Sequence, residues 1–335
     1  MAQIRCVQLQ GGGEDVCKSE IYQAKATGST FTALATKTGL FVGNSTGGWK
    51  KVVNDRCLSL VPRNNGFLVA TETNGLAHVY PEPSGEWKSD SHSWIIGGKK
   101  WKKFTLVGVG FGYVFAVLDY KRMIRFKLNQ EDEGPIEITD KIFLPCDDMQ
   151  TRCILKIDTT FDYGKTKSVS IGTNRGLFVT TDGHDWHSAR RISDESANHF
   201  VDVCSHRCDA YVANGSGIIK YASLLNRKSI TGSQPTVISQ SLKSGKKSFE
   251  VVAILDINLN DYIFIGTSAK MFAARLPRGN IDPVYHELQF EASPIEHPEP
   301  YYSSVAYNRM EQIIYITSLR GVVAISTKDV VEMCL

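Results

Sequence analysis

The chain of 335 residues is 42% hydrophobic and 22% charged, and its formal net charge is +3. This is the ordinary composition of a globular protein with a sizeable core, and so small a net charge does not indicate any class of partner. No run of about 18 apolar residues occurs, which excludes a membrane-spanning helix.

The first residues and the cysteines together predict a cytoplasmic protein. The start, Met1-Ala2-Gln3-Ile4-Arg5-Cys6, lacks the apolar stretch of a secretory signal. Several of the eight cysteines fall in apolar runs, where cysteine packs as a small hydrophobe. We therefore expect reduced thiols, although an even number of cysteines also allows disulfides.

One pattern recurs along the chain: a β-rich run ending in Thr or another small residue, a short turn usually holding Gly, and a second apolar run. Its instances span residues 35–42, 70–77, 117–124, 171–178, 212–219, 265–272 and 316–323. The glycine has a physical reason, because a short hairpin turn needs a positive φ. Where Arg122 or Lys270 stands in its place, we expect a different turn geometry.

Each repeat extends to four strands. An apolar run that can form an innermost strand precedes each hairpin, at 21–27, 57–61, 104–109, 153–158, 200–204, 249–255 and 302–307. An outer strand follows, opened by Trp49, Trp87 and Trp186 in three of the repeats. Short strands that repeat at uneven spacing predict an all-β fold, a seven-bladed β-propeller of four-stranded antiparallel blades that forms a single domain over 1–335.

The ends of the chain are expected to close the ring. The seventh repeat has three clear strands up to Ile325, and the run 3–9 precedes the first blade. Adding this N-terminal strand to the last blade would remove an exposed sheet edge. The run 330–333 near the C-terminus is the alternative closing strand.

One turn resembles the Asp-box of sialidase-type and sortilin-type propellers. It reads Thr180-Thr181-Asp182-Gly183-His184-Asp185-Trp186, one residue shorter than that motif, and 44–49 is a weaker echo. The resemblance implies a fold and a structural turn rather than a site. In such a turn Asp182 accepts backbone N–H bonds and Trp186 packs between sheets.

Signals of catalysis or metal binding are weak. The chain lacks the arginine pattern of a sialidase site, so a glycosidase-like enzyme with a central pocket remains only an alternative. The segment Cys204-Ser205-His206-Arg207-Cys208 has the ligand types of a zinc site, but its spacing favours two strands joined by a turn. We expect no cofactor, no metal and no catalytic residue.

The charges are distributed unevenly. In a propeller, the turns between second and third strands share one face with the loops between blades. The cations expected on that face, and chosen as partner-binding residues together with one tryptophan, are Lys37, Lys99, Lys100, Trp101, Lys102, Lys103, Lys121, Arg122, Arg175, Lys270 and Arg320. The opposite face is expected to collect carboxylates, among them Glu82, Glu86, Asp182, Asp185, Asp209 and Asp261.

The segment 94–103 interleaves lysines with Trp94 and Trp101. Such a segment can bind nucleic acid or an anionic lipid surface, and the alternative is a solvated loop. We therefore expect a monomeric, non-enzymatic scaffold that presents its basic face to an acidic protein segment or another polyanion. A glycan-binding lectin is a further alternative, and the partner itself cannot be derived from the sequence.

Overall fold

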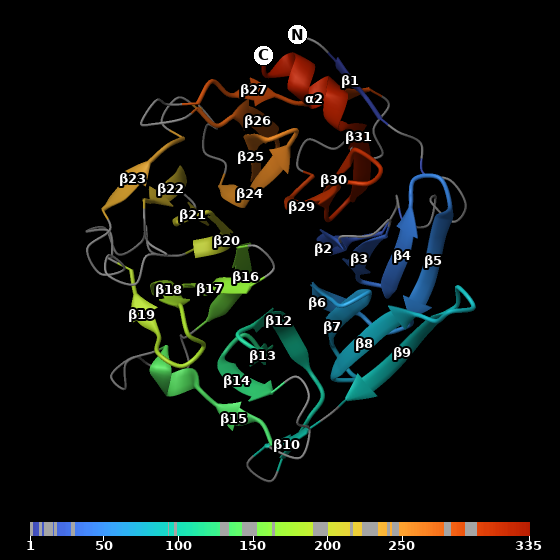
Figure 1. Ribbon diagram of the computed structural model, residues 1–335, viewed down its shortest axis with the longest axis vertical. Coiled ribbons are helices and arrows are strands. Elements are labelled where there is room, and N and C mark those ends of the chain that lie inside the picture. The colour runs from blue at the N-terminus through green and yellow to red at the C-terminus, as the bar shows by residue number, and fades with distance from the viewer. Residues whose placement is uncertain are drawn as a thin grey trace.

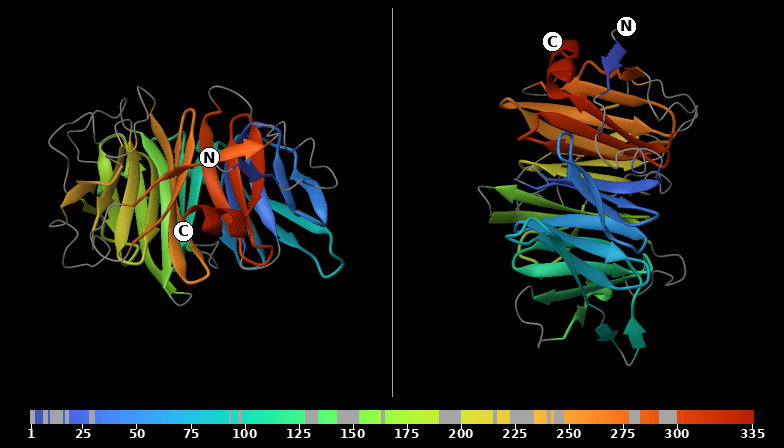
Figure 2. Two further views of the ribbon diagram at one scale, coloured as in Figure 1. Left: turned by 90° about the horizontal axis from the view of Figure 1, so that it is seen from above. Right: turned by 90° about the vertical axis from the view of Figure 1, so that its right-hand side faces the viewer.

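The computed structural model describes residues 3–6, 9, 16, 19–27, 31–92, 94–96, 99–127, 134–142, 153–162, 165–189, 200–214, 217–222, 234–239, 242, 248–277, 283–291 and 300–335. Seven antiparallel sheets stand around a central axis, and the chain passes through them in order (Figure 1). Seen from the side, the ring is a short, thick disc (Figure 2). The seven-bladed propeller predicted from the sequence is confirmed.

Within each blade the strands run outward from the axis in chain order. Blade 1 holds β2 (Ile21–Ala26), β3 (Thr32–Thr36), β4 (Leu40–Asn44) and β5 (Gly48–Val53). Blade 2 holds β6 (Cys57–Arg63), β7 (Gly66–Thr71), β8 (Leu76–Pro81) and β9 (Trp87–His92). Blade 3 holds β12 (Phe104–Gly110), β13 (Tyr113–Leu118), β14 (Arg122–Lys127) and β15 (Ile136–Glu137), followed by the 3-10 turn η1 (Thr139–Lys141).

The other blades follow the same plan. Blade 4 holds β16 (Ile154–Asp162), β17 (Lys165–Thr173), β18 (Gly176–Thr180) and β19 (His187–Ser188). Blade 5 holds β20 (Phe200–His206), β21 (Asp209–Asn214), β22 (Gly217–Tyr221) and β23 (Pro235–Val237). Blade 6 holds β24 (Phe249–Ile257), β25 (Asn260–Thr267), β26 (Met271–Arg275) and β27 (His286–Glu287), and blade 7 holds β29 (Tyr302–Asn308), β30 (Ile313–Ser318) and β31 (Gly321–Ser326).

The core is divided into seven apolar clusters, one between each pair of neighbouring blades. Between blades 1 and 2, for example, Leu40 of one sheet and Phe67 of the next are both fully buried. This arrangement explains why the middle strands read as continuous apolar runs, since both of their faces are covered.

Every innermost strand carries a β-bulge at the same place. In several blades the side chain just after the bulge reaches the next blade and accepts a backbone N–H. Gln23 accepts from Leu60 at 2.8 Å, and Ser59 accepts from Val107 at 3.3 Å. Asp202 accepts from Val252 at 3.0 Å, and Ser304 accepts from Ala24 at 2.8 Å. The bulges therefore direct polar side chains of one blade toward the backbone of a neighbouring blade.

The recurring Thr-turn-Gly pattern corresponds to a side-chain bond across the hairpin. The Oγ1 of Thr71 donates to the carbonyl of Gly75 at 2.7 Å and accepts from the backbone of Asn74. Thr36, Thr173, Thr267 and Ser318 bridge their own turns in the same way. In blade 3, where Arg122 replaces the glycine, the positive φ moves to Asp119 and Tyr120, which is the altered turn we expected.

Both ends of the chain meet at the last blade (Figure 1). The strand β1 (Gln3–Arg5) pairs in parallel with β28 (Gln289–Glu291), and Cys6 forms an antiparallel bridge to Ile325 on β31. The N-terminal run thus takes the place of the fourth strand, as predicted. The alternative strand at 330–333 is wrong, because that run lies in the helix α2 (Thr327–Met333), whose first turn is capped by Ser326.

A second set of contacts seals blade 7 against blade 1. Glu311 lies in the turn before β30, and its carboxylate accepts hydrogen bonds from the backbone and the hydroxyl of Ser45 in blade 1 at 2.7 and 2.6 Å. The same carboxylate accepts from Tyr315 and Asn308. The apolar cluster beneath includes Trp49, whose ring meets that of Tyr315 edge-on at 5.7 Å. The junction between the chain ends is therefore packed like the other six.

Candidate functional site

The turns between second and third strands lie on one side of the disc, called here the hairpin face. The expected cations of this face that the structure describes are largely exposed. Lys37, Lys102, Lys103, Lys121, Lys270 and Arg320 are exposed, while Arg122 and Arg175 are half-buried. They are spread over the turns and loops of several blades.

Four of these cations stand beside carboxylates of the same face. Lys37 lies 3.0 Å from Glu20, Lys103 lies 3.4 Å from Asp119, and Lys270 lies 2.6 Å from Glu287. Arg122 binds Glu137 through two guanidinium nitrogens. The bond from Arg122 lowers the pKa of Glu137, and the bond from Lys37 lowers that of Glu20. The face is therefore a ring of exposed ion pairs rather than an unbroken basic surface.

The lysine- and tryptophan-rich segment forms a small hairpin that the sequence did not indicate. The strands β10 (Trp94–Ile96) and β11 (Lys99–Trp101) pair antiparallel outside the blades, between β9 and β12. The side chains of Lys99, Lys100 and Trp101 lie outside the described residues. The backbone carbonyl of Lys102 accepts a bond from Gly75 at 2.8 Å, which fixes the end of this segment to the turn of blade 2.

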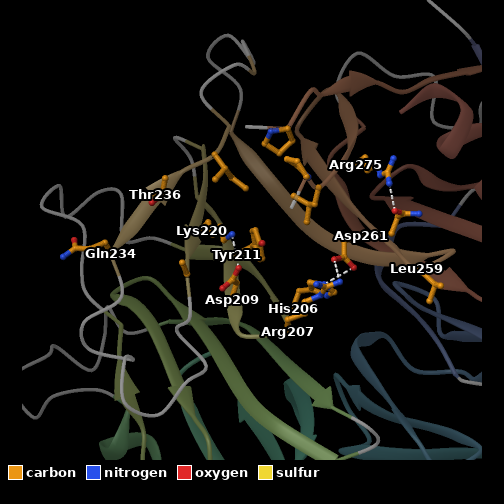
Figure 3. A pocket seen from close by; sticks show the side chains of 16 residues that line it. His206, Arg207, Asp209, Tyr211, Lys220, Gln234, Thr236, Leu259, Asp261 and Arg275 are labelled. Carbon is orange, nitrogen blue, oxygen red and sulfur yellow. Dashed lines mark hydrogen bonds and ion pairs between the residues drawn. The ribbon is translucent and has the colours of Figure 1, made fainter. Parts of the chain in front are cut away.

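A large pocket lies on the opposite face, between blades 5 and 6 (Figure 3). Its volume is about 970 Å³. One wall is formed by β21, β22 and β23 of blade 5, and the other by the β24–β25 turn and the end of β26 in blade 6. Residues from such distant segments meet only when two blades pack together, so no local sequence motif predicts this pocket.

The charged side chains that line the pocket form ion pairs. His206 and Arg207, from the β20–β21 turn, lie 3.1 and 2.7 Å from the two carboxylate oxygens of Asp261 (Figure 3). Lys220 lies 3.0 Å from Asp209. Both carboxylates were expected on this face, but each one has a cation beside it. The predicted acidic character is therefore offset by neighbouring cations.

Apolar groups complete the pocket. Ile238, Leu276, Pro277 and Pro283 line it beside the polar residues, and Leu259 at its edge is 88% exposed. Arg275 has a polar rather than an ionic neighbour, since it donates to Asn260 at 2.6 Å. A pocket of this size with mixed lining can hold a short peptide segment or a small polar molecule.

The innermost strands carry ion pairs that also hold the blades together. Lys156 lies 3.0 Å from Asp202, and Lys25 of blade 1 reaches to 4.0 Å from Asp158 of blade 4. Both carboxylates also accept backbone bonds from the next blade, Asp202 from Val252 and Asp158 from Ser205. Burial is the main influence on Asp158 and raises its pKa. These carboxylates, which a central-pocket enzyme would use, are engaged in joining blades.

The segment 204–208 forms the end of β20 and its turn, as its spacing favoured. Cys204 faces the interior, where burial raises the pKa of its thiol, and Cys208 accepts a bond from Lys167 at 3.2 Å. Within the described ranges, no group of three or more His, Cys, Asp or Glu residues is arranged to hold a metal ion. Cys57, Cys153, Cys204, Cys208 and Cys334 are free thiols.

The turn at 180–186 makes the contacts expected of it. The carboxylate of Asp182 accepts the backbone N–H groups of His184 and Asp185 at 2.8 and 2.9 Å. Trp186 packs edge-on against Phe115 of blade 3, with ring centroids 5.8 Å apart. The residues therefore serve the turn and the contact between blades, in keeping with a structural role.

Comparisons with known proteins agree on the fold alone. No protein-family model matches the sequence, and no curated protein matches it either. The structure is similar to the extracellular domain of a putative one-component system from B. thetaiotaomicron, with TM-score 0.65 and 13% identity over 96% of this chain. The chain spans only 39% of that structure's length.

Two shorter neighbours match from end to end. YCF48 from Cyanidioschyzon merolae has TM-score 0.64 and 12% identity, over 98% of this chain and 100% of that one. The WD40 β-propeller domain of Doa1 has TM-score 0.61 and 9% identity, over 97% of each chain. Among the described residues, no helix is long and apolar enough to cross a membrane.

Proposed function

We propose that this protein is a non-catalytic interaction module that binds an acidic segment of a partner protein on its hairpin face. The observation that carries this proposal is the exposure of lysine and arginine side chains from hairpin turns of four blades, and of Lys102 and Lys103 from the loop before blade 3, on one side of the ring. A protein segment laid across that side would meet cations from several blades at once.

The ion pairs of this face are compatible with such binding. The side chains of Lys37 and Glu20 are 56% and 42% exposed, and those of Lys103 and Asp119 are 46% and 47% exposed. Exposed pairs of this kind each contribute only about 0–1 kcal/mol. A partner with several carboxylates can therefore compete for the cations at low cost. Lys102 and Arg320 form no ion pair within the described part of the chain.

Charge reversal on each face tests the proposal. The first variant replaces Lys99, Lys100, Lys102 and Lys103 by Glu. The matched control reverses Lys88, Lys165, Arg275 and Arg309, which are exposed on the opposite face. Binding of a fluorescently labelled oligoglutamate peptide is measured by anisotropy at low and at moderate ionic strength.

We expect the first variant to bind at least tenfold more weakly than the wild type and the control to bind as tightly as the wild type. Binding by the wild type should also weaken steeply as salt is added, because screening acts on exposed charges. Equal loss in both variants would show non-specific attraction and would refute the hairpin face as the binding surface. Preferential binding of an oligonucleotide or of anionic vesicles would assign the face to a different partner.

A further inference from the structure

A second, smaller cleft lies between blades 4 and 5, on the face opposite the hairpin turns. Its volume is about 340 Å³, which is room for roughly ten water molecules at about 30 Å³ each. The β20–β21 turn, carrying His206 and Arg207, forms a wall of this cleft and of the larger pocket next to it (Figure 3).

The polar lining of this cleft consists of groups that can donate hydrogen bonds. The described polar side chains that reach it are the hydroxyls of Thr160 and Ser205, the ammonium of Lys167, and the side chains of His206 and Arg207. No described residue lining the cleft carries a carboxylate. Hydroxyls beside cations, without a carboxylate, form a donor set suited to an oxyanion.

The backbone of β17 directs the side chain of Lys167 toward the cleft. In the pairing of β16 with β17, Thr160 faces Ser168 and Phe161 faces Thr166, so that Lys167 is the extra residue of a β-bulge. Its ammonium lies 3.2 Å from the sulfur of Cys208 in the blade 5 turn, which shows that the side chain points across the gap between blades. Bulges commonly redirect a side chain in this way.

One hydroxyl at the cleft lacks a bonding partner among the described residues. Thr160 is only 6% exposed, it lines the cleft, and its buried Oγ1 has no partner. The neighbouring Thr159 points to the other face of the sheet, toward Gly108 of blade 3. A buried hydroxyl without a bond costs free energy and therefore calls for an explanation. Rotation of the Thr160 side chain toward the cleft would let this hydroxyl bond an acceptor oxygen of a ligand.

The remaining neighbours are compatible with an anion. Ser205 shares a hydrogen bond with Ser170 at 2.9 Å, and when Ser170 donates, the hydrogen of Ser205 can point into the cleft. Arg207 contacts Asp261 on the other side of the turn, and its side chain is 68% exposed. Behind the cleft, Asp158 accepts the backbone N–H of Ser205, and Lys25 lies 4.0 Å from its carboxylate on the other side.

We propose that the cleft between blades 4 and 5 binds a phosphate group, free or esterified, through Lys167 and the hydroxyls of Thr160 and Ser205. A phosphate offers three strong acceptor oxygens and close to two negative charges at neutral pH, which matches a lysine surrounded by hydroxyl donors. This site lies on the other side of the disc from the surface proposed for the acidic partner. The phosphate site can therefore be tested independently of that proposal.

The test titrates the full chain with inorganic phosphate and, separately, with O-phosphoserine, at constant ionic strength set with chloride. Thermal melting and backbone amide NMR shifts report binding. We expect both the melting temperature and the shifts around 160, 167 and 205 to change saturably. The tighter of the two ligands identifies whether free or esterified phosphate is the preferred form.

The variants Lys167→Gln and Thr160→Val are each expected to weaken phosphate binding at least tenfold. The matched control is Lys165→Gln, an exposed lysine two residues away on the same strand, which should bind like the wild type. Thr160→Val should keep or raise the melting temperature without ligand, because it removes a buried hydroxyl that has no partner.

Two results would overturn the site. One is an unchanged melting temperature and unchanged amide shifts with either ligand. The other is equal affinity of Lys167→Gln and the wild type, a comparison that holds even where Thr160→Val does not fold. A Thr160→Val protein with lower stability and normal phosphate affinity would likewise assign that hydroxyl a structural role and remove it from the site.

Discussion

Single hydroxyls determine the geometry of the hairpin turns. Thr71 is fully buried at the end of β7, where its hydroxyl donates to the carbonyl of Gly75 and accepts from the amide of Asn74. Each backbone group also has a second partner, since the carbonyl of Gly75 accepts the N–H of Thr71 at 3.0 Å and the amide of Asn74 donates to Asp55 at 2.9 Å. The repetition of this bond explains why Thr recurs at that position in the sequence.

Thr71→Val keeps the shape of the side chain and removes the bond. We expect a loss of about 1 kcal/mol in the free energy of unfolding, because the turn loses the hydrogen bonds of one buried hydroxyl while both backbone groups keep a second partner. Urea denaturation measures the change. Thr73→Val, at an exposed position of the same turn, is the control and should stay within about 0.5 kcal/mol of the wild type. Equal losses in the two variants would contradict this role of Thr71.

At the scale of the element, the bulged inner strands link one blade to the next. Asp202 shows this best, because one carboxylate oxygen accepts the amide of Val252 in blade 6 while the other lies 3.0 Å from Lys156 in blade 4. A single side chain thus joins three consecutive blades. Its side chain is 6% exposed, so both contacts are shielded from water.

Asp202→Ala is expected to lower the free energy of unfolding by about 3–5 kcal/mol, since it leaves Lys156 without its partner and the amide of Val252 without an acceptor. Asp202→Asn keeps an oxygen for Val252 and should lose less. The control Asp256→Ala breaks an exposed pair with Arg309 and should cost at most about 1 kcal/mol. Chemical denaturation ranks the three variants, and a control as unstable as Asp202→Ala would argue against a special role for the inner strand.

At the scale of the whole molecule, stability depends on closing the ring. The seven apolar clusters form a closed circle, in which one cluster joins blade 7 to blade 1 and the N-terminal run completes the cluster of blades 6 and 7. Ile4 is 2% exposed and belongs to the same cluster as Phe264 and Ile325. A residue near the start of the chain is therefore part of the core built by its last strands.

Ile4→Ala should destabilise the protein by about 2–5 kcal/mol, the usual cost of truncating a buried aliphatic side chain. Leu335→Ala, at the other end of the chain, is the control because Leu335 is 85% exposed. Differential scanning calorimetry would report the difference as a lower melting temperature for the first variant alone. Similar melting of both variants would mean that the N-terminal strand contributes little to closure.

The sequence by itself determined the number of blades, the inner strands and the hairpins, because each depends on local features: recurring apolar runs, a terminal threonine and a turn glycine. It also indicated that the N-terminal run closes the ring. The same local signals explain why the sequence alone indicates a structural role for the turn at Asp182.

Only the tertiary structure decided which charges meet. The pairing of Lys37 with Glu20, of Arg207 with Asp261, and the placement of Thr160 beside Ser205 each depend on how strands or blades distant in sequence pack together. The sequence sorted charges by face but could not show that cations and carboxylates of one face stand a few ångströms apart. Electrostatic interaction depends on distance through space, and that distance is set only when the ring closes.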